Sequence, residues 1–289
     1  RKENMNTKVR GRKDLENLSI PFIGEIPQYL SAKKKLGFDK HTQSVMKAIV
    51  VKEGNRNIIN EAFRVLRSNI DFMAGKDSGQ NVFMLTSFNP GSGKSFLAMN
   101  IAMSFAIKKK RILVIDGDLR HGSTSSYVDS PKTGLSDYLG NRVSDWKEII
   151  VKDEKYDNLH IIPIGTVPPN PTELLEDGKL ATLIEVLRSE YDYIFIDCPP
   201  IDIVADAQII EKLADRTVFV VRSGLLDRSM LPELENIYQE KRFKNLSVIL
   251  NGTESAGGRY GYRYGYRNGY SSYYGNKGKM GGGKWMVIK

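Results

Sequence analysis

One segment, residues 82–102, constrains the fold more than any other part of the chain. It reads VFMLTSFNPGSGKSFLAMNIA, which predicts a buried strand, a glycine-containing loop and a helix that opens at Lys94. Gly91 and Gly93 permit unusual backbone angles, so that successive N–H groups and the helix N-terminus can face phosphate oxygens. The sequence therefore predicts a phosphate-binding loop, whose candidate nucleotide contacts are Pro90, Gly91, Ser92, Gly93, Lys94, Ser95 and Phe96.

Within this loop, Lys94 and Ser95 have separate expected tasks. The Lys94 ammonium would neutralise the β- and γ-phosphates of ATP, and the Ser95 hydroxyl would bind Mg²⁺. The strict pattern G-x-x-x-x-G-K-[ST] is not met, because Phe88 stands at its first glycine. An ordinary glycine-rich turn is the alternative, but a G-x-G-K-S run between a buried strand and an apolar helix disfavours it. A dinucleotide-binding G-x-G-x-x-G also fails, because Phe96 replaces its third glycine.

Apolar runs alternate with helical patterns along most of the chain. This alternation predicts an α/β fold of the doubly wound class, with a mostly parallel sheet covered on both faces. A helix with a stop at Gly75 precedes the loop segment. The predicted strands are 82–87, 111–116, 159–164, 193–197, 217–223 and 246–252, and the predicted helices are 58–75, from 94 onward, 172–190 and 230–243.

Three aspartates directly follow predicted buried strands. ILVIDGDLR brings Asp116 and Asp118 to one strand end, and YIFIDCPP brings Asp197 to another. Ligands of open α/β sheets bind at the carboxyl ends of the strands, and a buried carboxylate needs a cation or a metal as partner. Alone, each segment could form a helix cap or a structural ion pair. Together with Lys94, the three aspartates predict that Mg²⁺ is coordinated at these strand ends.

Charge and composition divide the chain into three parts. The formal net charge is +9, but residues 255–289 carry no acidic residue and seven basic ones, so the remaining chain is near +2. The expected parts are a mobile basic arm over residues 1–19, a domain over 20–254, and a disordered tail over 255–289 that is rich in Gly, Tyr, Ser and basic residues. Seven of the 14 tyrosines lie in that tail: Tyr260, Tyr262, Tyr264, Tyr266, Tyr270, Tyr273 and Tyr274.

No run in this sequence reaches the roughly 18 apolar residues that span a bilayer. The chain starts at Arg1 rather than Met, and its charge-rich start is typical of a segment just inside a membrane, so we expect a fragment with a span upstream. A solvated terminal arm accounts for the same residues equally well. The single cysteine, Cys198, excludes an internal disulfide framework and favours a reducing compartment.

The combination of TSFNPGSGKS, ILVIDGDLR and IFIDCPP resembles the Walker A, Walker A′ and Walker B motifs of the bacterial tyrosine kinases, or BY-kinases. These are P-loop proteins of the deviant Walker branch, which also contains the partition ATPases. Their loop has the form T-S-x-x-P-G-x-G-K-[ST], which accounts for Pro90 and for the missing glycine at Phe88. The resemblance implies that Lys94 holds the phosphates, that Ser95, Asp118 and Asp197 serve Mg²⁺, and that Asp116 accepts the tyrosine proton.

The resemblance also extends outside the nucleotide site. EAFRVLRSNI is similar to the family's oligomerisation helix, with Glu61, Arg64 and Arg67 at its E-x-x-R-x-x-R positions. This implies a homo-oligomeric ring, such as an octamer, in which the tail tyrosines are phosphorylated in trans. It further implies the cytoplasmic domain of an inner-membrane protein that regulates capsular or exopolysaccharide synthesis and export, with an upstream membrane region and a tyrosine phosphatase as partners. The alternative for this helix is a solvated face with paired charges.

Two other functions remain open from the residues. A partition-type P-loop ATPase would hydrolyse ATP and dimerise, but such proteins carry a second loop lysine where this chain has Asn89. A nucleic-acid-binding protein could use the Arg and Tyr residues of the tail to contact phosphates and stack on bases. We expect no nucleic-acid partner, because the positive charge is concentrated in the tail and the body of the chain is nearly balanced.

Overall fold

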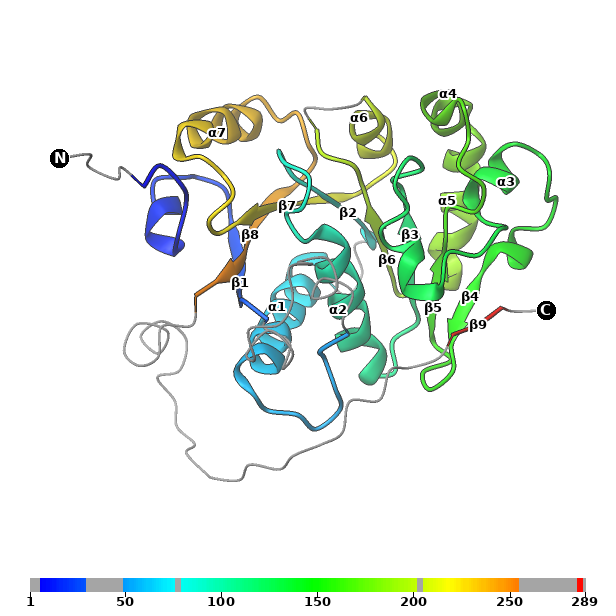
Figure 1. Cartoon of the computed structure of the whole chain (residues 1–289), viewed down its shortest axis with the longest axis horizontal. Helices are drawn as coiled ribbons and strands as arrows, with labels where there is room; N and C mark the ends of the chain where they lie inside the picture. The colour runs from blue at the N-terminus through cyan, green and yellow to red at the C-terminus, as the bar shows by residue number, and fades with distance from the viewer. Residues whose placement is uncertain (1–5, 30–48, 76–78, 202–204, 255–284, 288–289) are drawn as a thin grey trace, which may run out of the picture.

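A nine-stranded sheet lies between two layers of helices (Figure 1). The computed structural model describes residues 6–29, 49–75, 79–201, 205–254 and 285–287. The strands run in the order β1-β8-β7-β2-β6-β3-β5-β4-β9, and all pairs from β1 to β5 are parallel, whereas β4 pairs antiparallel with β5 and β9. Their bounds are β1 (Phe22–Pro27), β2 (Val82–Thr86), β3 (Ile112–Asp116), β4 (Val151–Asp153), β5 (Leu159–Ile162), β6 (Tyr193–Asp197), β7 (Arg216–Arg222), β8 (Leu246–Thr253) and β9 (Trp285–Val287).

Alternate residues of the central strands enter two separate apolar clusters. In β2, Met84 belongs to one cluster, and Phe83 and Leu85 belong to the other. The first cluster contains side chains of α5, α6 and α7, and the second contains those of α1 and α2. The prediction of a doubly wound, mostly parallel α/β fold is therefore confirmed. The helices are α1 (Ile58–Ala74), α2 (Lys94–Ile107), α3 (Leu135–Leu139), α4 (Pro171–Glu176), α5 (Lys179–Glu190), α6 (Asp206–Glu211) and α7 (Leu231–Gln239).

The predicted helix over residues 172–190 is two helices. Gly178 adopts a φ of +84° between α4 and α5, a conformation that side chains rarely tolerate and that breaks the helical ladder. The prediction over 230–243 extends too far, since α7 ends at Gln239 and Lys241 follows with a φ of +55°. The short elements β1, β4, α3 and α6 had no strong periodicity and were not predicted. None of the helices in the described ranges combines the length and the apolar character that crossing a bilayer requires.

Part of the basic N-terminal segment packs on the domain. Val9 is fully buried and Leu15 nearly so, and both belong to the first apolar cluster, which also contains side chains of α5, α6 and α7. The Val9 N–H donates to the Leu226 carbonyl at 2.8 Å, and Asp14 forms an ion pair with Arg228 at 3.1 Å. The expectation of a mobile arm is therefore wrong for residues 6–19, because two isolated apolar side chains suffice to fix a segment without any apolar period.

The tail prediction can be compared with the structure at one place only. Residues 255–284, which include all seven tail tyrosines, lie outside the described residues. Residues 285–287 form β9, the outermost strand of the sheet, which pairs antiparallel with β4. The expectation of a disordered segment up to residue 289 is therefore wrong for these three residues.

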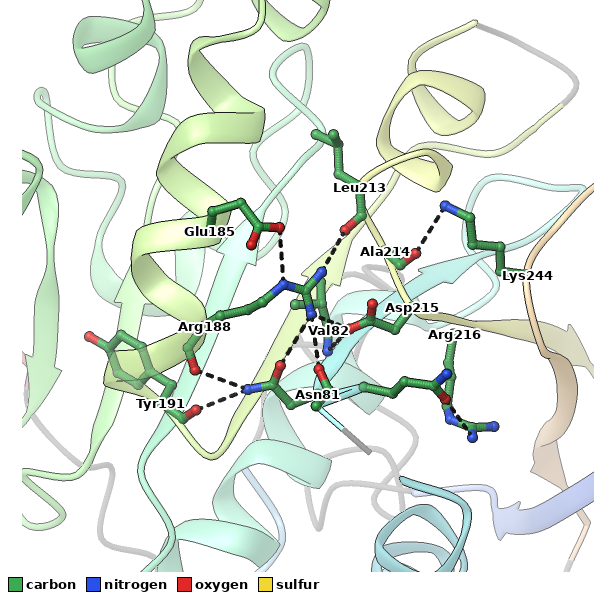
Figure 2. A network of polar contacts seen from close by, with 12 residues as sticks. Asn81, Val82, Glu185, Arg188, Tyr191, Leu213, Ala214, Asp215, Arg216 and Lys244 are labelled. Atoms are coloured by element: carbon green, nitrogen blue, oxygen red, sulfur yellow. Dashed lines mark hydrogen bonds and ion pairs between the residues drawn. The ribbon is translucent and has the colours of Figure 1, made fainter. Parts of the chain in front are cut away.

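A polar network joins α5 to the amino ends of β2 and β7 (Figure 2). The Arg188 guanidinium pairs with Asp215 and also donates to the Asn81 side chain at 3.3 Å. Asp215 in turn accepts from the Val82 backbone N–H at 2.9 Å. Asn81 donates to the carbonyls of Arg188 and Tyr191 at 3.2 and 3.1 Å. Arg188 thus fixes α5 against the N-terminal ends of β2 and β7. The predicted phosphate-binding loop lies at the other end of these strands.

We predict that Arg188→Leu lowers the free energy of unfolding by about 2–4 kcal/mol, because Asp215 loses its ion pair and the Asn81 side-chain oxygen loses a hydrogen bond in a partly buried place. Arg111→Ala is the matched control: its ion pair with Asp192 is more exposed, so its loss should cost about 1 kcal/mol or less. Urea unfolding followed by circular dichroism measures both. Equal effects of the two substitutions would contradict this role of Arg188.

Candidate nucleotide-binding site

The candidate residues lie at the C-terminal ends of three neighbouring strands in the middle of the sheet. β6 lies between β2 and β3, and the last residues of β3 and β6, Asp116 and Asp197, are paired in register. The loop that follows β2 leads into α2, whose first residue is Lys94. The topology therefore brings together the carboxylates and the lysine loop, as their positions after buried strands indicated.

The loop backbone is shaped to receive an anion. Gly91 and Gly93 have φ values of +74° and +91°, and a side chain at Gly91 would meet open space. Gly93 is the N-cap of α2, and neither a side-chain cap nor an acidic residue in the first turn occupies that helix end. The free N–H groups and the positive end of the helix dipole thus remain available to phosphate oxygens.

Three side chains donate hydrogen bonds to carbonyl groups of the loop. Arg222, at the end of β7, donates to the Gly91 carbonyl at 2.5 Å, and Asn251 of β8 donates to the Ser92 carbonyl at 3.0 Å. The Ser92 hydroxyl donates to the Asn89 carbonyl at 2.7 Å. Because these carbonyls are fixed on one side, the loop N–H groups are oriented before any ligand binds. Arg222 thus supports the backbone of the loop.

Lys94 is a buried cation among acidic groups. Only 9% of the residue is exposed, and its ammonium donates to the Ser87 hydroxyl at 2.9 Å. Burial lowers the pKa of Lys94, while the charges of Asp197 and Asp118 raise it in opposition. The lysine is thus placed to compensate a carboxylate in the free protein and a phosphate in a complex.

Asp197 accepts hydrogen bonds from two hydroxyl groups. Ser95 and Thr124 both donate to its Oδ2 atom, the latter at 2.7 Å. Burial raises the pKa of Asp197, although Lys94 and the two hydroxyls lower it in part. Thr124 is completely buried and was not identified from the sequence, where it follows Asp116 by eight residues without a recognisable motif.

Asp116 is completely buried beside Asp197. The backbone N–H and the hydroxyl of Ser125 donate to its Oδ2 atom at 2.8 and 2.6 Å. Burial, together with the negative charge of Asp197, raises the pKa of Asp116 to about 8. In the free protein the pair therefore favours a shared proton over two adjacent charges.

Asp118 lies at the mouth of this cluster. It is 9% exposed, its backbone N–H donates to Asp116 at 3.2 Å, and His121 Nδ1 lies 3.2 Å from its Oδ2 atom. Carboxylate and hydroxyl oxygens from Ser95, Asp118 and Asp197 are the hard donors that suit Mg²⁺, which commonly takes one or two carboxylates together with substrate phosphates. Within the described ranges, no group of three His, Cys, Asp or Glu side chains is arranged to hold a metal by itself.

The other candidate residues lie apart from this cluster or reach it only through the backbone. The Phe96 ring is buried against the Phe63 ring of α1, with 6.0 Å between the two ring centroids. Only the backbone of Phe96 can therefore face a nucleotide. Pro90 is exposed at the tip of the loop. Glu61, Arg64 and Arg67 lie on α1, where Glu61 and Arg64 form an ion pair. Ser87 belongs to the T-S-x-x-P pattern, whereas Ser125 and Asn251 support the site but carried no signal in the sequence.

Comparisons with known proteins show which sequences this chain resembles. A family model described as an AAA domain matches residues 80–242. The tyrosine-protein kinase YwqD of Bacillus subtilis is 34% identical over 210 residues, which cover 72% of this chain and 87% of YwqD. The tyrosine-protein kinase CpsD of Streptococcus pneumoniae is 34% identical over 221 residues, which cover 76% of this chain and 92% of CpsD. A longer relative from the cps region of Klebsiella pneumoniae is matched over only 33% of its own length.

Solved structures show the same architecture. The kinase domain of the Escherichia coli tyrosine kinase ETK superimposes with a TM-score of 0.73 at 28% identity, covering 89% of this chain and all of that domain. The chimerical protein CapA2B2 gives a TM-score of 0.71 at 29% identity, covering 85% of this chain and all of that chain. The shared fold, the loop and strand-end residues at one sheet edge, and the extent of the sequence matches lead to one conclusion. This chain belongs to the family of bacterial tyrosine-protein kinases.

Proposed function

We propose that this chain is a protein-tyrosine kinase that uses ATP and Mg²⁺ and phosphorylates the tyrosines of its own C-terminal tail. The observation that carries the proposal is the convergence of Lys94, Ser95 and Asp197 at one sheet edge, next to an uncapped helix N-terminus. Membership of the tyrosine-kinase family supports the choice of tyrosine as acceptor.

Phosphoryl transfer requires mainly positioning and charge neutralisation. The loop N–H groups and Lys94 would hold the β- and γ-phosphates, while Ser95, Asp118 and Asp197 would hold the metal ion. When bound, Mg²⁺ supplies the positive charge that neutralises the phosphates and lowers the pKa of neighbouring acids. The groups behind the loop, Arg222 and Asn251, keep the N–H groups aimed at the phosphates.

Asp116 is the proposed acceptor of the tyrosine proton. Burial and the charge of Asp197 raise its pKa to about 8, so the ionised carboxylate that can accept a proton is the minor form at neutral pH in the free protein and becomes the major form above about pH 8. A base with a pKa near the working pH is well matched to a proton transfer. Ser125 fixes the orientation of the carboxyl group through two hydrogen bonds to one oxygen.

The proposed acceptors are the seven tail tyrosines, which lie outside the described residues. Their neighbours in the sequence are Gly, Arg, Asn and Ser, so core packing does not explain them. A flexible linker of about 15 residues has a root-mean-square reach of roughly 20 Å, which is enough to enter an active site of the same or an adjacent subunit. We propose the adjacent subunit, in a ring such as an octamer.

The exposed face of α1 supports oligomerisation. Ile58, Val65 and Phe72 are 61%, 43% and 89% exposed and recur every seven residues, so they form an apolar stripe along one side of the helix. The ion pair of Glu61 with Arg64 lies on the same helix. An exposed apolar stripe on a helix with charged neighbours is typical of a protein interface. We propose that α1 joins the subunits through this stripe together with Glu61, Arg64 and Arg67.

The remaining parts of the proposal concern the cellular context. Relatives from cps regions suggest a role in capsular or exopolysaccharide synthesis and export, at the cytoplasmic face of a bacterial inner membrane. The upstream membrane region of a longer protein would be the signalling partner, and a tyrosine phosphatase would reverse the reaction. Each phosphotyrosine adds about −1.5 to −2 charges, so three or four would offset the seven basic residues of the tail. We infer that this charge reversal dissociates the ring.

Lys94→Met tests the proposed activity. With ATP and Mg²⁺, the wild-type chain should acquire phosphate on tail tyrosines, and the variant should show at least about a hundredfold less, because it loses the cation that contacts the transferred phosphate. Mass mapping of phosphotyrosine is the measurement. ATP hydrolysis without any phosphotyrosine would instead favour a partition-type ATPase.

A second test addresses the ring. The double substitution Arg64→Ala and Arg67→Ala should yield monomers in light scattering, and Phe72→Ser alone should weaken assembly. Phe72 is 89% exposed, so its replacement should leave the melting temperature unchanged and separate assembly from folding. An unchanged oligomer mass in both variants would refute the role of α1.

A further inference from the structure

A cationic cavity lies between α1 and the C-terminal end of α2. Its volume is about 510 Å³, which is within the range of small-ligand pockets. The loop at residues 51–56 forms one wall, and residues of α1 and α2 form the others. Five basic side chains line it, and they outnumber the two acidic ones, Glu53 and Glu61. The basic residues are Lys52, Arg56, Arg64, Arg67 and Lys108.

Both acidic side chains of the cavity already have partners. Glu61 pairs with Arg64, and Glu53 accepts a hydrogen bond from the Tyr156 hydroxyl at 3.2 Å. The cavity therefore keeps an excess of three positive charges after its carboxylates are counted. An excess of this size in a recess attracts anions more strongly than the same charges on a flat surface.

Arg67 donates hydrogen bonds to a carbonyl and a hydroxyl group of α2 rather than to a carboxylate. Its Nη1 atom donates to the carbonyl and the hydroxyl of Ser104, both at 3.2 Å, and it forms no ion pair within the described part of the chain. Partial burial and the charge of Arg64 lower the pKa of Arg67, and the charge of Asp71 opposes them in part. Arg67 thus uses one of its guanidinium nitrogens to support the last turn of α2. That structural role does not account for the other basic side chains around the same space.

This cavity is separate from the nucleotide site. α2 begins at Lys94, in the phosphate-binding loop, whereas Ser104, Ile107 and Lys108 line the cavity at its other end. With a rise of 1.5 Å per residue, the two ends are roughly 15–20 Å apart. A ligand in the cavity would therefore contact α1 and leave the ATP site open.

We propose that this cavity is a binding site for the phosphate group of a phosphotyrosine. An excess of three positive charges suits a phosphate monoester, which carries nearly two negative charges, and arginine nitrogens can bind two of its oxygens at once. The choice of phosphotyrosine rests on the proposed function, which produces this group on seven tail positions. It is also consistent with a space larger than inorganic phosphate alone requires.

The location of the cavity gives the site a consequence for assembly. Arg64 and Arg67 line the cavity and also belong to the proposed subunit interface. A phosphotyrosine bound there would withdraw both arginines from the neighbouring subunit. Phosphorylation would then dissociate the ring through a specific contact as well as through general charge repulsion.

The test uses the full chain with Lys94→Met, so that its own tail stays unphosphorylated whether or not the proposed activity is correct. The probe is a fluorescein-labelled peptide of residues 268–276, which has no charged side chain, with phosphate on Tyr273. Fluorescence anisotropy should show binding of the phosphopeptide and none of the unphosphorylated peptide. Arg56→Gln with Lys108→Gln, both outside the proposed interface motif, should weaken binding about tenfold or more.

Three controls separate phosphotyrosine binding in the cavity from general charge attraction and from binding at the nucleotide site. Lys132→Gln with Lys241→Gln removes the same charge elsewhere and should leave the affinity unchanged. Excess ADP with Mg²⁺ should not displace the peptide, since displacement would place it in the nucleotide site. Inorganic phosphate should compete only at concentrations well above that of the peptide. Equal affinity for inorganic phosphate, equal binding of the unphosphorylated peptide, or equal loss in the two double variants would overturn the proposal.

Discussion

Two carboxyl groups, those of Asp116 and Asp197, are held side by side at adjacent strand ends with almost no access to water. Such a pair is unfavourable unless a proton, a cation or hydrogen bonds compensate it, and here all three contribute. Ser125 serves Asp116, while Ser95 and Thr124 serve Asp197. Lys94 supplies a buried positive charge that interacts with Asp197. The site is therefore organised around two adjacent buried carboxyl groups and the groups that compensate their charge.

The position of this cluster follows from the order of the strands. β6 lies between β2 and β3, and the three strands are parallel. The loop after β2 therefore lies next to the aspartates at the C-terminal ends of β3 and β6. Two layers of helices bury the strands on both sides, which keeps the strand ends rigid. At the opposite edge, the Arg188 network fixes α5 to the starts of β2 and β7. The helix α2 then connects the nucleotide site to the cationic cavity beside α1.

Motifs with strict local geometry were readable from the sequence. The strand, loop and helix around Lys94 and the aspartates after buried runs predicted both the fold class and the main members of the site. Thr124, Ser125 and Asn251 were not predictable, because they reach the site only through tertiary packing from loops and a distant strand. The break at Gly178 was missed because the apolar period continues through it. Val9 and Leu15 show that single apolar residues can anchor a charged segment.

The central claim is that Lys94, Ser95, Asp118 and Asp197 act together on one magnesium nucleotide. The most direct test is to titrate ATP into the wild-type chain and into Ser95→Ala and to measure the affinity by calorimetry. Each titration is done once in the presence of Mg²⁺ and once with EDTA in its place. In the wild type, Mg²⁺ should strengthen ATP binding by about tenfold or more, which corresponds to about 1.4 kcal/mol, and in Ser95→Ala most of that gain should disappear. An identical gain in both proteins, or no ATP binding by the wild type, would contradict the claim.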